Sequence, residues 1–536
     1  MVLEKKKRLI FFWIIMGLIV FARAFLFGKV PGGINQDEAF SGYNAYTLLK
    51  FGKDSYGYSF PMYLMTWGSG MNALSSYLMI PVVAIFGLHT WSIRLVPCVL
   101  AILALVAVYK MIRENVKDDV LALFTMFFCG VAPWHIMLSR WALESNLAPA
   151  FLVFGMYFFL KGLKNEKYYI VSALIYGLSL YSYATVWTVV PVIVFLLVLY
   201  AILTKRMKFS KYTIISFVVL FLTALPAMLF ILVNKGTINE IRTPLLSIPK
   251  MVVFRGGEVS LKNIPGNFKN LKNILTTQND GLIWNSTEKF GIFYKFSLPF
   301  FFIGLAAVIA PLFLRFKKKE AVKAKEESKK ANNEGDFFFC TMVLLLAGFL
   351  VGILVNVNIN RVNIIFMPIL IITAYGWYSA FSNRKFKGIR LDIIPVILYL
   401  VCFISFEMFY FTEYRNDIGG CFREGLGDCF EVLEKECKDA EKVYVTHDIY
   451  YPRVLFYVEE NLNEYLDTVE YTNFPSAYLD VSSFGKYVLD VNTEAFPEEG
   501  AVYVVNSGSA DSYLVQMLEQ MGYNMYESKG YRIYYP

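Results

Sequence analysis

Long apolar segments recur through residues 1–411, and they constrain the fold more than any other feature of the sequence. Most hold roughly 18–22 residues, about the length of helix that crosses the ~30 Å hydrocarbon core of a bilayer. The chain is 57% hydrophobic and 18% charged, whereas soluble proteins average roughly 45–50% and about 25%. We therefore expect an α-helical polytopic membrane protein with about eleven transmembrane helices. The expected spans are residues 9–27, 92–112, 120–138, 148–160, 168–184, 186–203, 213–233, 292–314, 337–355, 362–381 and 393–411.

The distribution of charge predicts the orientation of these spans. The net charge of +8 divides into +22 for residues 1–411 and −14 for residues 412–536. The basic clusters all fall on one side of the membrane when about eleven spans are counted, and that side is expected to be cytoplasmic. The N-terminus is then inside and the acidic tail outside. The basic clusters are residues 5–8, 110–117, 161–167, 205–211, 315–330 and 384–390.

Two domains are expected. Residues 1–411 form the membrane domain, with two long outer loops at about 28–91 and 234–291, called here the first and second long loops. Residues 412–536 alternate strand-like and helix-like segments and predict a small extracytoplasmic α/β domain without a glycine-rich phosphate loop. Three cysteines there, Cys421, Cys429 and Cys437, permit at most one internal disulfide, and their spacing does not choose it.

The first long loop carries two adjacent carboxylates soon after the first span. Asp37 and Glu38 follow Pro31, Gly32 and Gly33, which break the helix and let the backbone turn near the membrane surface. One interpretation is structural, because an acidic residue there caps the helix expected over residues 39–50. The other is that the pair is catalytic. The spacing alone leaves both open.

Further charged residues follow at the same expected membrane face. Arg94 begins the second span, and Arg140 and Glu144 follow the third. Each arginine alone is typical of an anchor or an ion-pair partner. Charged groups near lipid are nevertheless costly unless they are paired or used, so the set indicates a site at the membrane surface.

The ordered motifs resemble a known superfamily. They are Asp37-Glu38, the stretch Gly52-Lys53-Asp54-Ser55-Tyr56-Gly57, Arg94-Leu95, and Pro133-Trp134-His135 running to Ser139-Arg140. Together they resemble the protein O-mannosyltransferase and aminoarabinose-transferase superfamily, whose members have the GT-C membrane glycosyltransferase fold. The resemblance is clearest over residues 9–163, continues weakly through the later spans, where Arg361 precedes Pro368, and does not cover the tail. It implies inverting transfer of a sugar from a polyprenyl-phosphate carrier to a hydroxyl acceptor on the outer face.

The resemblance assigns roles that chemistry supports. A hydroxyl becomes a good nucleophile when a positioned carboxylate takes its proton, and Asp37 is the expected base, with Glu38 orienting the acceptor or an arginine. The lipid phosphate leaves as an anion and needs positive charge, for which Arg94, Arg140 and Arg361 are candidates. Glu144 is a further substrate-binding candidate. The sequence establishes no cofactor, but the carboxylates of Asp37, Glu38 and Glu144 suit Mg²⁺ or Mn²⁺, so a divalent cation stays an open expectation.

Other interpretations of the sequence remain. A transporter or flippase of lipid-linked sugars shares the length and the basic loops, but it should place ionisable residues in mid-span and show repeated halves, which are not evident here. A first span cleaved as a signal peptide is a weaker alternative than a retained anchor. Basic residues of the second long loop fit either a segment lying on anionic lipid or a lid over the carrier phosphate. The expected partners are the lipid-linked donor, a lipid, polysaccharide or protein acceptor, and the bilayer, with no nucleic acid. The lack of a retention signal favours a bacterial plasma membrane.

Overall fold

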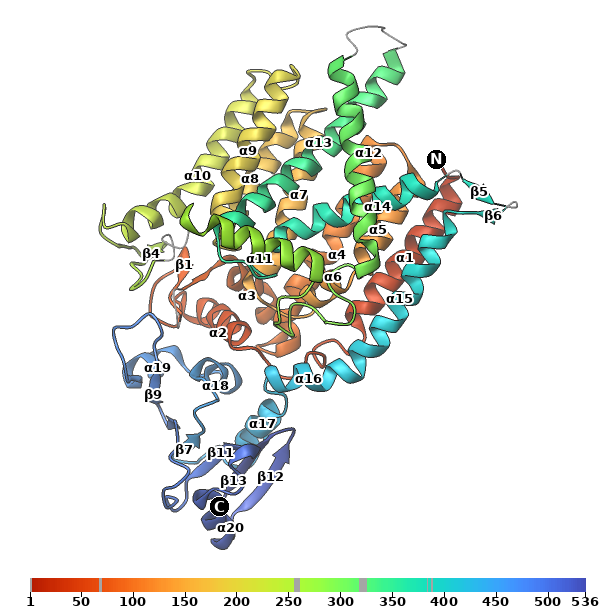
Figure 1. Ribbon diagram of the computed structural model, residues 1–536. Coiled ribbons are helices and arrows are strands. Elements are labelled where there is room, and N and C mark those ends of the chain that lie inside the picture. The colour runs from red at the N-terminus through yellow and green to blue at the C-terminus, as the bar shows by residue number, and fades with distance from the viewer. Residues whose placement is uncertain (1, 67–69, 255–260, 318–324, 383, 387–388) are drawn as a thin grey trace.

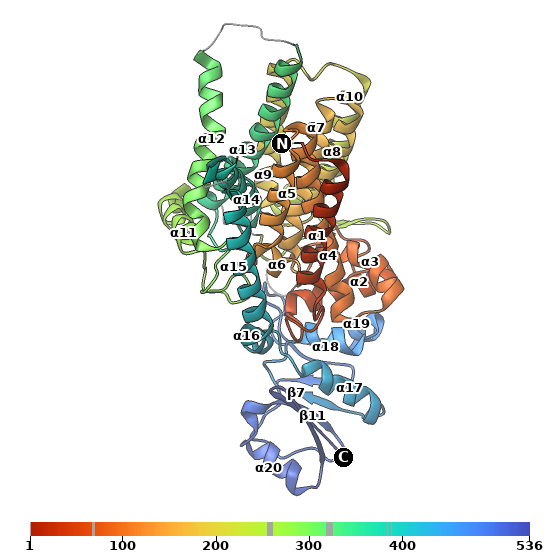
Figure 2. The same ribbon diagram turned by 90° about the vertical axis from the view of Figure 1, so that its right-hand side faces the viewer.

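The structure is a computed structural model, and it describes residues 2–66, 70–254, 261–317, 325–382, 384–386 and 389–536. A bundle of helices forms the larger part, and a mixed sheet lies at one end of it, with the chain termini at opposite ends of the molecule (Figures 1 and 2). The end of the bundle that carries the sheet is called here the sheet end.

Every segment expected to span the membrane contains a helix. Six helical segments of the described chain are long and apolar enough to cross a bilayer, so the count of eleven is not settled: Thr90–Asn115, Val186–Leu203, Lys211–Asn234, Asn333–Leu354, Asn363–Phe381 and Ile393–Phe411. The bundle helices are α1 (Lys5–Ala24), α4 (Thr90–Asn115), α5 (Asp119–Gly130), α6 (Pro133–Leu138), α7 (Ala148–Gly162), α8 (Lys167–Ser179), α9 (Val186–Leu203), α10 (Lys211–Asn234), α12 (Leu298–Lys317), α13 (Lys325–Leu354), α14 (Phe366–Phe381) and α15 (Ile393–Phe411).

The third expected span was predicted as one helix and is two. α5 ends at Gly130, and α6 begins at Pro133 after Ala132, whose backbone is extended (φ −66°, ψ 131°). Proline lacks an N–H and disfavours the α conformation of the residue before it, so the helix breaks there. The break turns the chain toward Arg140 and Glu144 at the sheet end.

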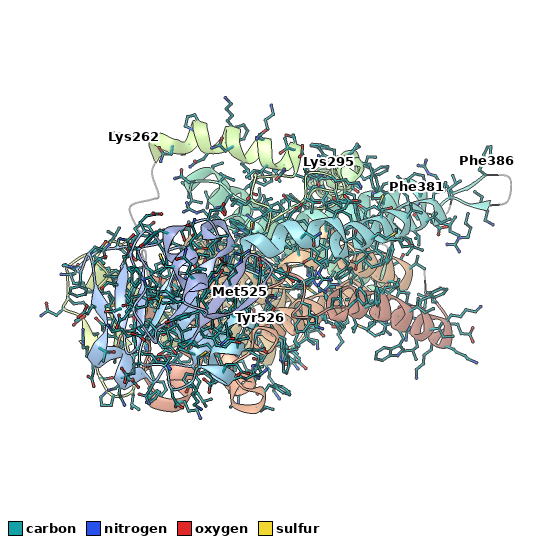
Figure 3. All side chains as sticks on the ribbon, turned by 90° about the horizontal axis from the view of Figure 1, so that it is seen from below. Lys262, Lys295, Phe381, Phe386, Met525 and Tyr526 are labelled. Atoms are coloured by element: carbon teal, nitrogen blue, oxygen red, sulfur yellow. The ribbon has the colours of Figure 1, made fainter. Side chains whose placement is uncertain are left out.

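Both long loops contain secondary structure of their own. The first holds the helix expected over residues 39–50 and a second helix, and the second long loop holds an amphipathic helix that runs along one side of the bundle from near Lys262 (Figure 3). The elements of the first loop are α2 (Gln36–Phe51), β1 (Tyr63–Leu64), β2 (Met71–Asn72) and α3 (Leu74–Phe86). Those of the second are β3 (Ile241–Arg242), β4 (Ser247–Ile248), η3 (Leu261–Asn263) and α11 (Ile264–Thr277). Three short helices, η1 (Glu144–Leu147), η4 (Lys295–Ser297) and η5 (Asn363–Ile365), lie at the starts of α7, α12 and α14, and β5 (Lys385–Phe386) pairs with β6 (Ile389–Arg390).

Residues 412–536 contain the strands and helices expected there. A seven-stranded mixed sheet has the order β12-β13-β11-β7-β10-β9-β8, with β11, β7 and β10 parallel at its centre. All seven cysteines of the chain are described and unpaired. The elements are α16 (Glu413–Cys421), α17 (Leu426–Glu436), β7 (Val443–Val445), α18 (Tyr451–Val458), α19 (Leu462–Thr468), β8 (Glu470–Tyr471), β9 (Val481–Phe484), β10 (Tyr487–Leu489), β11 (Val502–Asn506), η6 (Ser507–Ser509), α20 (Tyr513–Gln520), β12 (Asn524–Ser528) and β13 (Tyr531–Tyr535).

The sheet domain and the first long loop share their cores. Phe40 and Tyr43 of α2 pack in the same buried cluster as the sheet residues Val443 and Val502. In return, Phe456 of α18 packs among Ile34 and other residues of the first loop. α18 and α19 lie beneath α2 in Figure 1. The start of α2, which carries Asp37 and Glu38, is therefore held between the bundle and the sheet domain.

Candidate active site

The first long loop enters α2 through a capping box. Asn35 is the N-cap, and its side chain accepts the backbone N–H of Asp37 (2.9 Å). The Glu38 carboxylate accepts the backbone N–H of Asn35 in return (3.1 Å). Both Asp37 and Glu38 are capping candidates by sequence, and the structure gives the reciprocal cap to Glu38. Asp37 lies beside it, half-buried.

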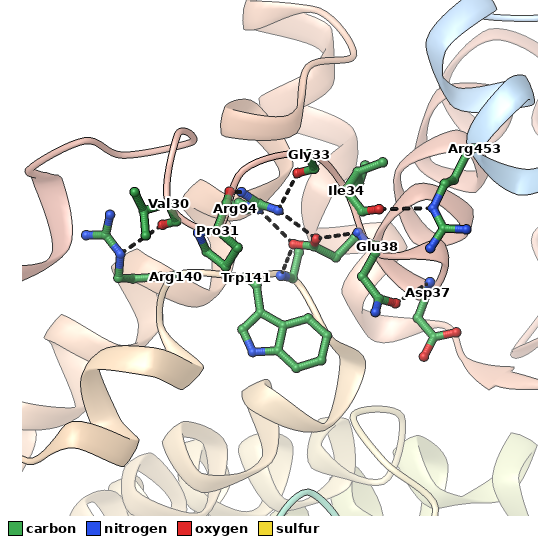
Figure 4. Close-up of polar contacts among 12 residues, drawn as sticks. Val30, Pro31, Gly33, Ile34, Asp37, Glu38, Arg94, Arg140, Trp141 and Arg453 are labelled. Carbon is green, nitrogen blue, oxygen red and sulfur yellow. Dashed lines mark hydrogen bonds and ion pairs between the residues drawn. The ribbon is translucent and has the colours of Figure 1, made fainter. Parts of the chain in front are cut away.

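Glu38 forms a fully buried ion pair with Arg94. Arg94 Nε and Nη2 donate to the two carboxylate oxygens at 2.9 and 2.8 Å, and both side chains are 0% exposed. The backbone N–H of Ala142 also donates to Glu38 (2.6 Å), so that carboxylate accepts four N–H groups in all. Arg94 further donates to the carbonyls of Pro31 (2.7 Å) and Gly33 (2.9 Å) (Figure 4). This pair fixes the loop that precedes α2.

Arg140 is also fully buried, and its guanidinium donates mainly to backbone carbonyls. Its five N–H groups donate to five carbonyls at the end of α1 and in the following turn, at 2.8–3.2 Å, and the guanidinium lies over the ring of Phe411. The accepting residues are Ala22, Arg23, Phe25, Leu26 and Val30. These placements differ from the expected phosphate contacts of Arg94 and Arg140, because their donors are directed to protein groups away from solvent.

Glu144 and Arg361 lie at the same end of the bundle. Glu144 is 8% exposed, and its carboxylate accepts the backbone N–H of Asn72 from β2. Arg361 is half-buried in the turn before η5, where its backbone N–H donates to Asn358 Oδ1 (2.8 Å). All six residues expected at the site thus lie at the sheet end, but two of the three arginines are sealed in the protein.

The sheet domain adds a residue that sequence reasoning missed. Arg453 of α18 is 4% exposed, and its Nε donates to the carbonyl of Ile34 (3.1 Å), one residue before the N-cap. Asp37 is one of the charges that act on its guanidinium, and burial lowers the pKa of Arg453. Figure 4 shows Ile34 between Arg453 and Arg94. No local pattern marks it, because it lies more than 400 residues along the chain.

The two long loops are joined beside α2. Asp54 Oδ1 accepts the backbone N–H groups of Tyr56 (3.0 Å) and Tyr58 (2.8 Å), and burial raises the pKa of Asp54 to about 7 against the effect of these bonds. Arg242 of β3 donates to the Tyr58 hydroxyl (2.7 Å). The lysines at 262, 269 and 272 around α11 are exposed, and Arg255 lies outside the described residues. The lid and the lipid-lying segment both remain predictions for this loop.

The described part of the chain contains no group of three histidine, cysteine or acidic side chains placed to hold a metal ion. The three carboxylates that the sequence offered for a cation, those of Asp37, Glu38 and Glu144, are therefore not gathered into one ligand set.

Comparison with known proteins identifies the fold. Residues 73–241 match the family model of dolichyl-phosphate-mannose-protein mannosyltransferases. No curated protein sequence matches the chain. Among solved structures, ArnT from Cupriavidus metallidurans bound to undecaprenyl phosphate superposes with a TM-score of 0.50 at 10% identity, covering 99% of this chain and 98% of that one. The oligosaccharyltransferase AglB from Archaeoglobus fulgidus, in complex with an inhibitory peptide and a dolichol-phosphate, gives 0.50 at 12% identity, covering 85% and 64%.

The chain has the GT-C fold. The expected fold class is confirmed, and the match over residues 73–241 supports the resemblance to this superfamily. The chain spans 64% of the length of AglB. The matched residues 73–241 contain Arg94, Arg140 and Glu144, whereas Asp37, Glu38, Arg361 and Arg453 lie outside them.

Proposed function

We propose that the chain is an inverting glycosyltransferase that moves a sugar from a polyprenyl-phosphate donor to a hydroxyl acceptor on the outer face of the membrane. The observation that carries the proposal is the contrast between the two adjacent carboxylates at the start of α2. Glu38 is sealed and accepts four N–H groups, whereas Asp37 is half-buried at the junction of the bundle and the sheet domain. Asp37 is therefore the base, and Glu38 positions it.

The reaction is a single displacement. The acceptor oxygen attacks the anomeric carbon, its proton passes to the Asp37 carboxylate, and the bond from that carbon to the phosphate oxygen breaks. Attack opposite the leaving group inverts the anomeric configuration. The leaving group is polyprenyl phosphate, already an anion, so no second carboxyl is needed as an acid, in contrast to a glycosidase.

Positive charge stabilises the leaving phosphate. Of the three arginines, Arg361 is the candidate for direct contact with the phosphate, because Arg94 and Arg140 donate to Glu38 and to backbone carbonyls. We assign those two arginines to holding the loop between α1 and α2 in place. We place Glu144 among the substrate-binding residues, and its carboxylate accepts the backbone N–H of Asn72 in β2.

The basic loops support the orientation of the protein. By the positive-inside rule the N-terminus is cytoplasmic and the sheet end faces outward, where a lipid-linked sugar and an acceptor can both reach Asp37. A bacterial plasma membrane fits this arrangement. ArnT bound to undecaprenyl phosphate and AglB bound to dolichol-phosphate support a donor of this chemistry.

The test compares Asp37→Asn with wild type. Membranes containing each protein are given radiolabelled polyprenyl-phosphate sugars, and transfer of label out of the lipid phase is measured. We expect Asp37→Asn to lower the rate about 10²–10⁴-fold, the usual contribution of a general base. Asp417→Asn is the matched control, since Asp417 is exposed on α16 at the same end of the molecule. Equal transfer by wild type and Asp37→Asn would overturn the assignment of the base, and no transfer by wild type from any carrier would overturn the proposed function.

A further inference from the structure

Next to the candidate active site lies a group of buried polar atoms that the protein leaves unsatisfied. Asn72 is 1% exposed, and neither its Nδ2 nor its Oδ1 has a hydrogen-bond partner among the described residues. The same holds for Oγ of Ser145 and Oδ1 of Asn363, both on side chains that are at most 1% exposed. Buried polar atoms are normally paired, and leaving one unpaired costs free energy. Four such atoms gather here without a partner among the described residues.

These atoms belong to one continuous patch. The backbone N–H of Asn72 donates to the carboxylate of Glu144, and Ser145 follows Glu144 in the chain. Asn363 Nδ2 donates to the carbonyl of Ser145 (2.7 Å). Three segments far apart in sequence, β2, η1 and η5, therefore bring Asn72, Glu144, Ser145 and Asn363 together. This set is called here the amide patch.

The amide patch is connected both to the helix that carries the proposed base, Asp37, and to the turn that carries the proposed phosphate contact, Arg361. Met71, next to Asn72, accepts a hydrogen bond from Ser41, about one turn of α2 beyond Asp37. The backbone of Ala142, two residues before Glu144, donates to Glu38. On the other side, Asn363 lies two residues after Arg361, the candidate phosphate contact. The patch is thus connected at one side to the helix that carries the base and at the other to the turn that carries Arg361.

The chemistry of the patch selects its ligand. Two carboxamides and a hydroxyl offer donors and acceptors together, and the carboxylate accepts only. Neighbouring hydroxyl groups of a sugar ring both donate and accept, so they match this set. A phosphate does not, because it would face Glu144 without a cation in the patch, and a polyprenyl chain has no polar groups to offer. Ordered water is the remaining partner, and the experiment must separate it from a sugar.

We propose that the amide patch is the subsite for the sugar ring of the donor, a neutral polyhydroxylated glycosyl group. This inference rests on the proposed function. Asn72 and Ser145 contact the ring hydroxyls with side-chain atoms that make no hydrogen bond within the described protein. The phosphate of the same donor lies toward Arg361, and the anomeric carbon lies toward Asp37.

The experiment measures how far the sugar improves binding of the lipid. The purified full-length chain is titrated with undecaprenyl phosphate and with a panel of undecaprenyl-phosphate-linked hexoses and pentoses. We expect at least one glycosylated lipid to bind wild type tenfold or more tightly than the bare lipid phosphate. Asn72→Leu and Ser145→Ala should each reduce that preference about tenfold and leave the affinity for bare undecaprenyl phosphate unchanged.

The variants are chosen so that loss of folding does not imitate the result. Neither removes a side-chain hydrogen bond present in the structure, so the ligand-free melting temperature should stay equal or rise. Asn115→Leu is the matched control, because Asn115 in α4 is 2% exposed and also has an unpaired Oδ1, but lies at the opposite end of the bundle. Its sugar preference should equal that of wild type.

Each other outcome overturns the inference in a distinguishable way. If wild type prefers a glycosylated lipid and both patch variants keep that preference, the patch holds ordered water only. If wild type binds every lipid of the panel and bare undecaprenyl phosphate equally, the subsite is overturned while the proposed function stands. If wild type binds none of the lipids, the proposed function fails, and the subsite fails with it.

Discussion

Two buried polar regions adjoin α2, and they differ in how completely their hydrogen bonds are made. In the Glu38–Arg94 pair both carboxylate oxygens are satisfied, and the guanidinium also binds two carbonyls. In the amide patch four side-chain atoms have no partner among the described residues. Both regions lie out of solvent. The difference indicates that the Glu38–Arg94 pair stabilises the loop before α2, whereas the amide patch has hydrogen-bonding atoms available to a ligand.

The charged residues predicted from the sequence also fall into two groups, those buried with protein partners and those that are half-buried. The motifs that mark a family need not mark the atoms that touch substrate, since Glu38, Arg94 and Arg140 are used to hold the turn between α1 and α2. Their neighbour Asp37 is the acidic residue of the pair that is not sealed. Substitutions in the Glu38–Arg94 pair should therefore lower the stability of the protein, and substitutions in the amide patch should change ligand binding.

The largest stability effect is expected from Arg94→Met. It leaves the Glu38 carboxylate buried without a cation, and breaking a buried ion pair from one side typically costs about 3–5 kcal/mol. Thermal melting of the purified protein in detergent measures the loss. The double variant Arg94→Met with Glu38→Met should recover a large part of it, because the unpaired charge is then gone. A double variant as unstable as the single one would show that the charge is not the cause.

Arg453→Met should have the next largest effect. It removes the hydrogen bond to the Ile34 carbonyl (3.1 Å) and with it a charged contact between the sheet domain and the start of α2. Hydrogen bonds from charged groups contribute about 1.5–3 kcal/mol. Hydrogen exchange of residues 30–38 should become faster in the variant. Lys435→Met is the control in the same domain, because the Lys435 side chain is 71% exposed, and unchanged exchange in both would contradict the role of Arg453.

Much of the fold could be predicted from the sequence, for a physical reason. A bilayer requires apolar helices, and each expected span contains a helix, although six segments of the described chain are long enough to cross a bilayer. Pro133 explains the break in the third expected span, which the apolar pattern does not predict. Strand-like and helix-like segments likewise predicted the α/β character of residues 412–536. The pattern Asn35-x-x-Glu38 is a capping-box signature that was available in the sequence, and it points to the structural use of Glu38.

The composition of the site could be predicted only in part. Charged residues near a membrane are costly unless they are paired or used, so Asp37, Arg94 and Arg140 could be predicted as site residues from the sequence. Asn72 and Asn363 carry no charge, and they become notable only once burial shows that their polar atoms are unpaired. Arg453 meets Ile34 across 419 positions of sequence, a contact that only the folded sheet domain creates.

The pH dependence of stability should show the cost of burying the Asp54 carboxylate. Its Oδ2 has no partner within the described chain, and burial raises its pKa to about 7. An unfolded aspartate ionises near pH 4, so between about pH 4 and pH 7 the unfolded chain binds fewer protons than the native one. Stability contributed by this group therefore falls as pH rises through that window, by up to roughly 1 kcal/mol per pH unit. Asp54→Asn should lose this slope in melting curves across the window, and parallel curves for the two proteins would contradict it.

The smallest effect concerns a neutral hydrogen bond made by the same helix, α2. Tyr43 of α2 is 0% exposed, and its hydroxyl donates to the backbone carbonyl of Glu460 (2.9 Å), joining the first long loop to the sheet domain. Tyr43→Phe keeps the ring in the shared core and removes only this bond, so about 0.5–1.5 kcal/mol should be lost. Melting temperature measures it, while sugar preference in the lipid titration should not change. A lost sugar preference in Tyr43→Phe would show that the satisfied contacts of α2 act on binding as well, and the distinction between the two regions would then not hold.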